Sequence, residues 1–359
     1  MRAWEKNFRV VDPYVPGEQP QTTDVIKLNT NENPYPPSPS VQKAKESMLV
    51  SRLRLYPDTK ATKLVKNLAK QYGVKEEQIF VGVGSDDVLG MAFLSFFNSE
   101  LPILFPNISY SFYKVWAALY KIPYEMMPLN EKFEIVKEDY YKKNGGIVIA
   151  NPNAPTSLAM GVDAIRDILL HNQESVVIID EAYIDFGGES ALKLINEFEN
   201  LLIVQTFSKS RSLAGIRIGY AMGNERLISQ LNSVKFAYNS YTMNLAAIEL
   251  GAMALEEQDY YDDITRKIIA TREEAIGEFA KRGFETFDSK TNFLFTKHNE
   301  IPAEYLFKAL KEKRIFVRFF NEPVLNQYLR VTIGTKEQMD QVYVALDDII
   351  SSYSKMKEI

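Results

Sequence analysis

The sequence predicts an α/β fold: a large domain whose mostly parallel sheet lies between helices, followed by a smaller α+β domain. Short apolar runs alternate with helical patterns between residues 60 and 221, which is typical of strand–helix–strand units. Beyond residue 260 the pattern changes to one long charged helix and several short strands. With 359 residues, of which 46% are hydrophobic, the chain is long enough to bury two cores.

Each expected element has its own signal. An N-terminal arm (1–40), rich in Pro, Asn and Tyr and without periodicity, is expected to wrap a surface and to cross a subunit boundary. In the large domain (41–255), helical spacing predicts helices, and apolar runs bounded by turn residues predict strands. The helices are expected over 60–72, 86–97 and 163–170, and the strands over 78–83, 101–105, 146–150, 175–179, 201–205 and 216–221. In the small domain (256–359), a helix over 261–281 precedes strands over 292–295, 315–318 and 328–332 and a final helix from 336.

Composition excludes several classes of function. A net charge of -5 without a basic cluster argues against nucleic acid as a partner. No apolar stretch approaches the roughly 20 residues that span a bilayer, so no membrane partner is expected. The charged first residues do not resemble a signal peptide, so the expected location is cytoplasmic. With no cysteine and two histidines, disulfides and thiolate sites are impossible and no metal site is expected.

Lys209 is the strongest single indication of chemistry. It lies among the hydroxyl residues of segment 206–212, directly after the apolar run 201–204. Desolvation at the end of a buried strand lowers the pKa of a lysine, and a neutral amine can form a Schiff base with an aldehyde. The alternative is a lysine that simply reaches solvent, which is the usual explanation for an isolated Ser-Lys pair.

Two other strand ends carry polar residues. The turn Gly-Val-Gly-Ser-Asp-Asp at 82–87 leads into a helix whose amide groups suit a phosphate, although taken alone a plain tight turn is the simpler explanation. Asp180 ends the apolar run 176–179, and Tyr183 lies three residues later. Asp180 is either a helix cap or an anion held against a protonated ring nitrogen, with the Tyr183 phenol donating to a neighbouring ring oxygen.

Taken together, these features describe a cofactor site. The proline-fixed loop at 151–156 could aim an amide at the same ring. A lysine amine, a phosphate-binding turn, an aspartate for a pyridinium and an Asn/Tyr pair for a phenolate are the groups that pyridoxal 5'-phosphate requires.

The chain resembles the fold-type-I aminotransferases over essentially its whole length, and within them the histidinol-phosphate aminotransferase family. The resemblance rests on the order and spacing of short segments, among them Leu-Asn-Thr-Asn-Glu-Asn-Pro-Tyr and Tyr-Leu-Arg-Val-Thr-Ile-Gly-Thr. The segments lie at 28–35, 56–58, 82–86, 180–183, 208–219 and 328–335. It implies a seven-stranded large-domain sheet, an arm that packs on the small domain and the partner subunit, and a homodimer with shared active sites.

The resemblance also assigns roles in cofactor binding. Lys209 would hold the cofactor and carry the proton between the substrate α-carbon and C4'. Asp180 would keep the pyridine nitrogen protonated, and Tyr183 would bond the phenolate. The residues expected around the phosphate are Gly84, Ser85, Asp86, Thr206, Ser208 and Arg217, with Tyr56 of the other subunit. Tyr110 would stack on the pyridine face, although a core tyrosine is the alternative in a chain with 20 tyrosines.

One departure concerns the family's Asn-Pro-Thr-Gly, whose asparagine contacts the phenolate. Here the segment reads Ala154-Pro155-Thr156-Ser157, so the contact is assigned to Asn153, comes from elsewhere or is absent.

Substrate recognition is expected to depend on arginines. Arg330 matches the family's anion-binding arginine, and Arg318 is a second candidate that could equally be a solvated strand residue. Tyr14 and Asn31 of the arm are expected to line the pocket. The implied reaction exchanges an amino group between histidinol phosphate and 2-oxoglutarate, giving imidazole-acetol phosphate and glutamate, in histidine biosynthesis. The alternatives are an aromatic amino-acid aminotransferase, a threonine-phosphate decarboxylase and a non-catalytic cofactor-binding regulator.

Overall fold

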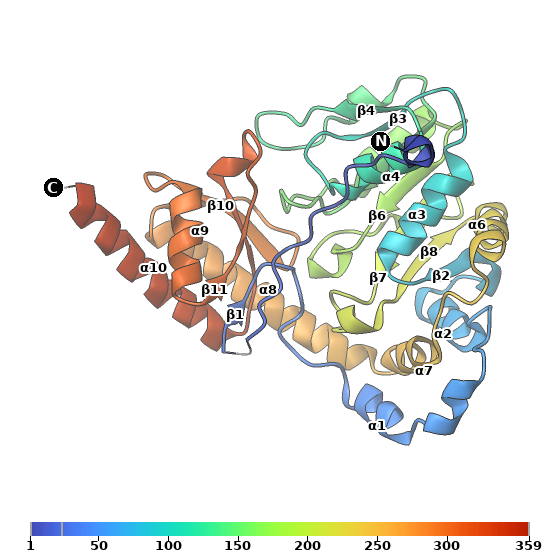
Figure 1. The fold of residues 1–359 in the computed structure, drawn as a ribbon, viewed down its shortest axis with the longest axis horizontal. Coiled ribbons are helices and arrows are strands. Elements are labelled where there is room, and N and C mark those ends of the chain that lie inside the picture. Colours follow the sequence, from blue (N-terminus) through green and yellow to red (C-terminus); the bar gives the residue numbers. More distant parts are fainter. Residues whose placement is uncertain (1, 23, 358–359) are drawn as a thin grey trace.

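The computed structural model describes residues 2–22 and 24–357, and its centre is a seven-stranded sheet (Figure 1). The strand order is β2 (Ile79–Gly82), β8 (Gly219–Gly223), β7 (Leu201–Thr206), β6 (Val177–Asp180), β5 (Gly146–Ala150), β3 (Ile103–Pro106) and β4 (Tyr124–Met127). Strand β8 runs antiparallel to both of its neighbours, and the other pairs are parallel. Every residue of β5, β6 and β7 is buried, as a sheet covered on both faces requires.

Helices cover the two faces of this sheet. On one face α2 (Thr62–Tyr72), α5 (Val162–His171) and α7 (Leu245–Ala254) pack against alternate strand residues such as Ile147 and Ile149. On the other face α3 (Ser85–Phe96), α4 (Phe112–Tyr120) and α6 (Glu225–Tyr238) pack against the intervening residues, such as Val148. Helix α1 (Pro39–Ser47) lies against α7. The α/β fold class predicted from the sequence is confirmed.

The C-terminal part forms a second core around a four-stranded antiparallel sheet. The strands follow the order β12 (Arg318–Phe319), β13 (Leu329–Thr332), β10 (Phe293–His298) and β9 (Phe284–Thr286). Helices α8 (Gln258–Lys281), α9 (Ala303–Glu312) and α10 (Lys336–Lys357) pack against it. Residues in the first part of α8, such as Ile264, belong to the large core, and later ones, such as Phe279, belong to the small one. Helix α8 therefore joins the two cores, and the division at residue 255 stays a prediction.

The structure adds a short strand to the arm, which was expected to pack on the small domain, and divides the strand expected near residue 316. Within the arm, β1 (Ile26–Lys27) pairs in parallel with β11 (Ile315–Phe316), and Leu28 is buried in the small core. The single strand expected over 315–318 is in fact β11 and β12, which belong to different sheets. The reason is that β11 pairs with the arm, whereas β12 pairs with β13. Short 3-10 helices lie at Ala3–Asn7, Val50–Arg54, Glu76–Gln78, Lys137–Tyr140, Ile184–Phe186, Ala191–Leu194, Ala214–Ile216 and Leu325–Gln327.

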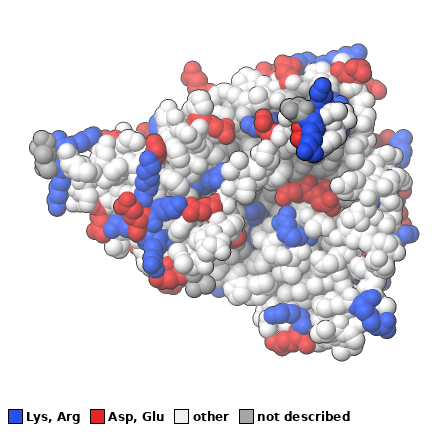
Figure 2. All heavy atoms as spheres, in the orientation of Figure 1, with Lys and Arg blue, Asp and Glu red and all other residues white. Residues whose placement is uncertain are grey.

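Acidic and basic side chains are interspersed over the face seen in Figure 2, where neither sign forms a continuous field. Several charged side chains pair across elements, such as Arg282 with Asp347 and Lys336 with Glu274. Among the helices of residues 2–22 and 24–357, none has the length and apolar character needed to cross a bilayer.

Candidate active site

A cavity of about 890 Å³ opens beyond the carboxyl ends of β5, β6 and β7 and reaches the small domain and the arm. Ligands of open α/β sheets bind at this edge. Most residues singled out from the sequence line it: Tyr14, Asn31, Ser85, Asp86, Tyr110, Asp180, Tyr183, Thr206, Ser208, Lys209, Arg217, Arg318 and Arg330. Gly84, Asn153 and Tyr56 are not among the lining residues.

Lys209 lies three residues beyond the end of β7, so the buried strand fixes where its side chain starts. Its Nζ donates a hydrogen bond to the Thr30 carbonyl oxygen at 3.3 Å and lies 5.6 Å from the centre of the Tyr183 ring. The neighbouring carboxylate of Glu32 is bound by Lys27 Nζ at 2.5 Å. Lys27 therefore engages the anion that could otherwise pair with Lys209.

Asp180 is the last residue of β6 and is only 5% exposed. Tyr113 Oη donates to its Oδ2 at 2.8 Å, and the Ala182 amide donates to its Oδ1 at 3.3 Å. Burial nevertheless raises the pKa of Asp180 to about 6, because these donors do not offset the loss of water. A cation placed against this carboxylate would lower the pKa again. No local sequence pattern indicates Tyr113, whose contact with Asp180 joins α4 to β6.

The turn before α3 and the nearby Arg217 side chain offer the donors that a phosphate needs. The first turn of a helix offers unpaired amide groups and the positive end of its dipole. Arg217 Nη2 lies 3.2 Å from Asp86 Oδ2, and Arg217 Nη1 donates to Ser208 Oγ at 3.5 Å. Gly84 has a φ of +83°, and a Cβ there would collide with the Arg217 guanidinium. The glycine thus allows the arginine to approach the turn.

Asp86 binds two other side chains at this turn, Tyr110 and Arg217. It accepts a hydrogen bond from Tyr110 Oη at 2.7 Å in addition to the pair with Arg217. A carboxylate repels a phosphate, so Asp86 is placed to orient Arg217 and Tyr110 rather than to bind the phosphate itself. Thr206 Oγ1 donates to Ser208 Oγ at 3.0 Å and thereby holds the Ser208 hydroxyl in place.

Tyr183 is held by Asn31 across a long distance in sequence. Asn31 Nδ2 donates to Tyr183 Oη at 2.8 Å, and Asn31 Oδ1 accepts from Thr332 Oγ1 at 3.1 Å. Since the phenol oxygen accepts this bond, its own hydrogen can point into the cavity. Asn31 is 1% exposed and adopts a φ of +58°, which asparagine tolerates well. The geometry favours a contact with Tyr183 over the substrate contact predicted for Asn31.

Asn153 is engaged within its own loop. Its Nδ2 donates to the Ile108 carbonyl at 3.0 Å and to Thr156 Oγ1 at 2.9 Å, and its Oδ1 accepts from Ser109 Oγ at 2.7 Å. Ala154, not Asn153, lines the cavity. These contacts disfavour the phenolate contact expected of Asn153 and leave the Tyr183 phenol as the donor.

Arg330, on β13, is a buried cation at the small-domain wall of the cavity. Its Nη2 donates to the Asn29 carbonyl at 3.0 Å, while its Nε has no hydrogen-bond partner among the described residues. The guanidinium lies between the rings of Phe293 and Phe320, 5.3 and 5.6 Å from their centres. Burial lowers the pKa of Arg330, and within residues 2–22 and 24–357 no carboxylate pairs with it. Such a cation calls for an anionic ligand.

Two further candidates lie beside Arg330 or across the cavity from it. Arg318, on β12, is the residue that pairs with Arg330 in the antiparallel register, and its Nη2 lies 3.5 Å from the Val15 carbonyl oxygen of the arm. Tyr14 stacks on Phe112, with ring centres 4.4 Å apart, and its ring lies 6.3 Å from that of Tyr110. Tyr14 of the arm thus joins Tyr110 and Phe112 in an aromatic cluster that lines the cavity.

Tyr56 lies apart from this cavity, on the surface. Its side chain is 82% exposed and its ring lies 4.5 Å from that of Tyr241. Leu49, Val50 and Leu53, just before it, are also exposed. Within one chain, Tyr56 is not placed to act on the cofactor site of the same chain.

The fold and this set of residues define the class of protein. The chain belongs to the family of aminotransferases of class I and II, whose pattern matches residues 23–346. Enzymes of this family use pyridoxal phosphate, and the cavity fits it. The fit rests on the buried Asp180 carboxylate, which forms no ion pair within the described part of the chain, on Arg217 at the first turn of α3, on the Tyr183 phenol that accepts from Asn31, and on the amine of Lys209.

Particular relatives are similar over nearly the whole chain. The histidinol-phosphate aminotransferase of Lactococcus lactis subsp. cremoris (strain MG1363) is 50% identical over 353 residues, which are 98% of this chain and 99% of the relative. The structure of histidinol-phosphate aminotransferase from Sinorhizobium meliloti in complex with pyridoxal-5'-phosphate has a TM-score of 0.82 at 23% identity, covering 91% of both chains. That of L-threonine-O-3-phosphate decarboxylase from Porphyromonas gingivalis has a TM-score of 0.79 at 21% identity, covering 91% of this chain and all of that one. The two structures support the fold alone.

Proposed function

We propose that this chain is a histidinol-phosphate aminotransferase that transfers an amino group between histidinol phosphate and 2-oxoglutarate. The observation that carries the substrate class is Arg330, a buried guanidinium at the cavity with an unpaired Nε and no carboxylate beside it in the described part of the chain. A phosphomonoester and the side-chain carboxylate of glutamate are both anions that an arginine fork binds. The relative that is 50% identical over 98% of the chain supports the same substrate.

Each residue of the cavity has a separate role in the proposed reaction. When bound, pyridoxal phosphate draws electrons from the substrate α-carbon and carries the amino group between the two substrates. Lys209 holds the cofactor and moves a proton between the α-carbon and C4'. Asp180 keeps the ring nitrogen protonated, since its buried carboxylate is stabilised by an adjacent cation. Tyr183 would donate to the ring oxygen, Arg217 and the turn at Ser85 would bind the phosphate, and Tyr110 would pack against the ring.

We further propose a homodimer in which Tyr56 reaches the phosphate of the partner's cofactor. The exposed apolar segment that ends at Tyr56 supports an interface at this place, because a soluble monomer rarely exposes contiguous apolar side chains. The interspersed surface charges and the net charge of -5 suit a cytoplasmic enzyme of small molecules rather than a nucleic-acid-binding protein.

An aromatic amino-acid aminotransferase is the second candidate, because Tyr14, Tyr110, Phe112 and Phe320 line the cavity. An aromatic wall suits a phenyl ring as well as an imidazole. Steady-state assays of histidinol phosphate, histidinol, phenylalanine and phosphothreonine, each with 2-oxoglutarate, separate the possibilities. We expect kcat/KM to be highest for histidinol phosphate. Equal turnover of phenylalanine would favour the aromatic enzyme, and release of CO₂ from phosphothreonine would favour the decarboxylase.

A further inference from the structure

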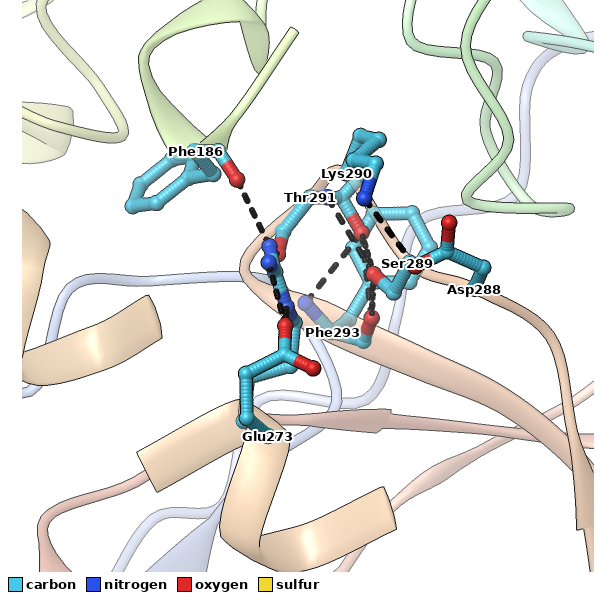
Figure 3. Close-up of polar contacts among 8 residues, drawn as sticks. Phe186, Glu273, Asp288, Ser289, Lys290, Thr291 and Phe293 are labelled. Carbon is cyan, nitrogen blue, oxygen red and sulfur yellow. Dashed lines mark hydrogen bonds and ion pairs between the residues drawn. The ribbon is translucent and has the colours of Figure 1, made fainter. Parts of the chain in front are cut away.

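A buried arginine of α8, Arg272, joins a turn of the large domain to a turn of the small domain. It is 2% exposed and lies on the helix that runs from one core to the other. Its Nη1 donates to the Phe186 carbonyl at 2.7 Å and to the Thr291 carbonyl at 2.9 Å. Its Nε and Nη2 donate to Glu273 Oε1 at 3.1 and 2.7 Å. In Figure 3 the Phe186 carbonyl and the Glu273 carboxylate, two acceptors of the Arg272 side chain, lie apart from each other.

The carbonyl groups that Arg272 binds belong to two rigid turns. Phe186 ends the 3-10 turn that starts at Tyr183, in which the Phe186 amide donates to the Tyr183 carbonyl at 3.1 Å. Thr291 lies in a turn closed by Ser289 Oγ and Thr291 Oγ1, which donate to the Phe293 carbonyl at 2.7 and 3.0 Å (Figure 3). Arg272 therefore links the turn that carries Tyr183 to the start of β10.

A second route leads from the same place back to Tyr183. Asn292, next to Thr291, donates from Nδ2 to the Asn31 carbonyl at 3.0 Å, and Asn31 donates to the Tyr183 phenol at 2.8 Å. The backbone of Tyr183 is thus tied to Arg272 through Phe186, and its phenol is tied to Arg272 through Asn31 and Asn292. The contacts form a closed ring.

We propose that Arg272 is a positioning residue that fixes the Tyr183 phenol relative to the cofactor ring through this closed ring of contacts. The inference rests on the proposed contact between Tyr183 and the cofactor. A guanidinium is suited to the task because its planar fork binds several acceptors in fixed directions, whereas the ammonium of a lysine is a point charge. Removing the guanidinium leaves the Phe186 and Thr291 carbonyl groups without this donor. Both chains of contacts that hold Tyr183 then lose their link to α8.

The test compares Arg272→Met and Arg272→Lys with Tyr183→Phe and a control, Arg282→Met. Arg282 is the residue that follows the C-terminal end of the same helix and pairs with Glu278 and Asp347, and it takes no part in the closed ring of contacts. The first readout is the pH midpoint of the absorption change of the bound cofactor in each holoenzyme. A phenol that donates to the ring oxygen stabilises its ionised form, so loss of the donor raises the midpoint. We expect Tyr183→Phe to raise it by about one pH unit, equivalent to about 1.4 kcal/mol, and both Arg272 variants to raise it in part.

The second readout is hydrogen exchange of the amides of Phe186 and Gly188 in the cofactor-free protein, which should become roughly tenfold faster in the Arg272 variants. Arg282→Met should leave both readouts unchanged. If Arg272→Met does not fold, the two readouts of Arg272→Lys test the inference, because lysine keeps the positive charge but lacks the planar guanidinium. Unchanged midpoints and exchange in the Arg272 variants, with a raised midpoint in Tyr183→Phe, would overturn the inference alone. An unchanged midpoint in Tyr183→Phe would instead overturn the proposed role of Tyr183.

Discussion

Replacing Asp180 with asparagine should stabilise the cofactor-free protein while it removes most of the turnover. The carboxylate is buried, and the burial raises its pKa to about 6 from an ordinary value of 3.8. The folded protein therefore holds this proton more tightly than the unfolded chain does. Ionisation of Asp180 costs no stability below about pH 4, and the cost is complete above about pH 6.

The magnitude follows from the two pKa values. Their difference corresponds to about 3 kcal/mol of unfolding free energy at pH 8. Asparagine has no charge to bury, and its side-chain carbonyl oxygen can still accept the hydrogen bond that the Tyr113 hydroxyl donates to Asp180, so the fold should persist. The variant should therefore gain up to about 3 kcal/mol at pH 8, and the gain should fade as the pH falls toward 4. Turnover should fall on the order of a hundredfold or more, because the ring nitrogen loses its anion.

Urea unfolding of the cofactor-free protein at a series of pH values measures the gain. Asp167→Asn is the control, because hydrogen bonding to Lys137 lowers the pKa of that surface carboxyl and its removal should bring no gain. Bound cofactor should reduce the difference in unfolding free energy between wild type and Asp180→Asn, since the pyridinium stabilises the buried carboxylate but has no charge to pair with in the variant. An Asp180→Asn protein that is no more stable than wild type at pH 8 would refute the reasoning.

Four further predictions concern the cavity and the interface. Borohydride reduction of the holoenzyme followed by peptide mapping should place the pyridoxyl group on Lys209, and label on another lysine would contradict the assignment. Mixing inactive Tyr56 and Lys209 variants should restore part of the activity in heterodimers that keep one intact site, whereas no recovery after verified subunit exchange would mean that one chain builds each site. Arg330→Ala should slow both half-reactions by on the order of 10- to 100-fold, a loss of roughly 1.5 to 3 kcal/mol, because phosphate and carboxylate bind the same guanidinium. Arg318→Ala should affect histidinol phosphate more than glutamate, and equal losses would assign Arg318 to general packing.

The parts of the fold with strong local signals were predictable from the sequence. Strands β5, β6 and β7 are buried on both faces and read as continuous apolar runs, so their positions agree within two residues. Helix α7 gives no such signal, because it is apolar almost all round and lacks a polar stripe. The two strands β11 and β12 cannot be separated by pattern, since only their partners, β1 and β13, distinguish them.

The candidate site shows the same limit. Asp180 and Lys209 could be singled out because each follows a recognisable strand, and the ends of parallel strands meet at one edge. The contact of Tyr113 with Asp180 joins residues 67 apart in sequence, and that of Asn31 with Tyr183 joins residues 152 apart. Such contacts depend on how whole elements pack, and no local pattern records them.

The most direct test is a single-turnover half-reaction, in which the holoenzyme is mixed with excess histidinol phosphate and no 2-oxoglutarate. The account predicts one equivalent of imidazole-acetol phosphate per active site from the wild type, with conversion of the bound cofactor to its amine form. Lys209→Ala, reconstituted with the cofactor, should give none on the same timescale, because it lacks the group that moves the proton. Absence of keto product from the wild type, or an equal yield from Lys209→Ala, would contradict the central claim.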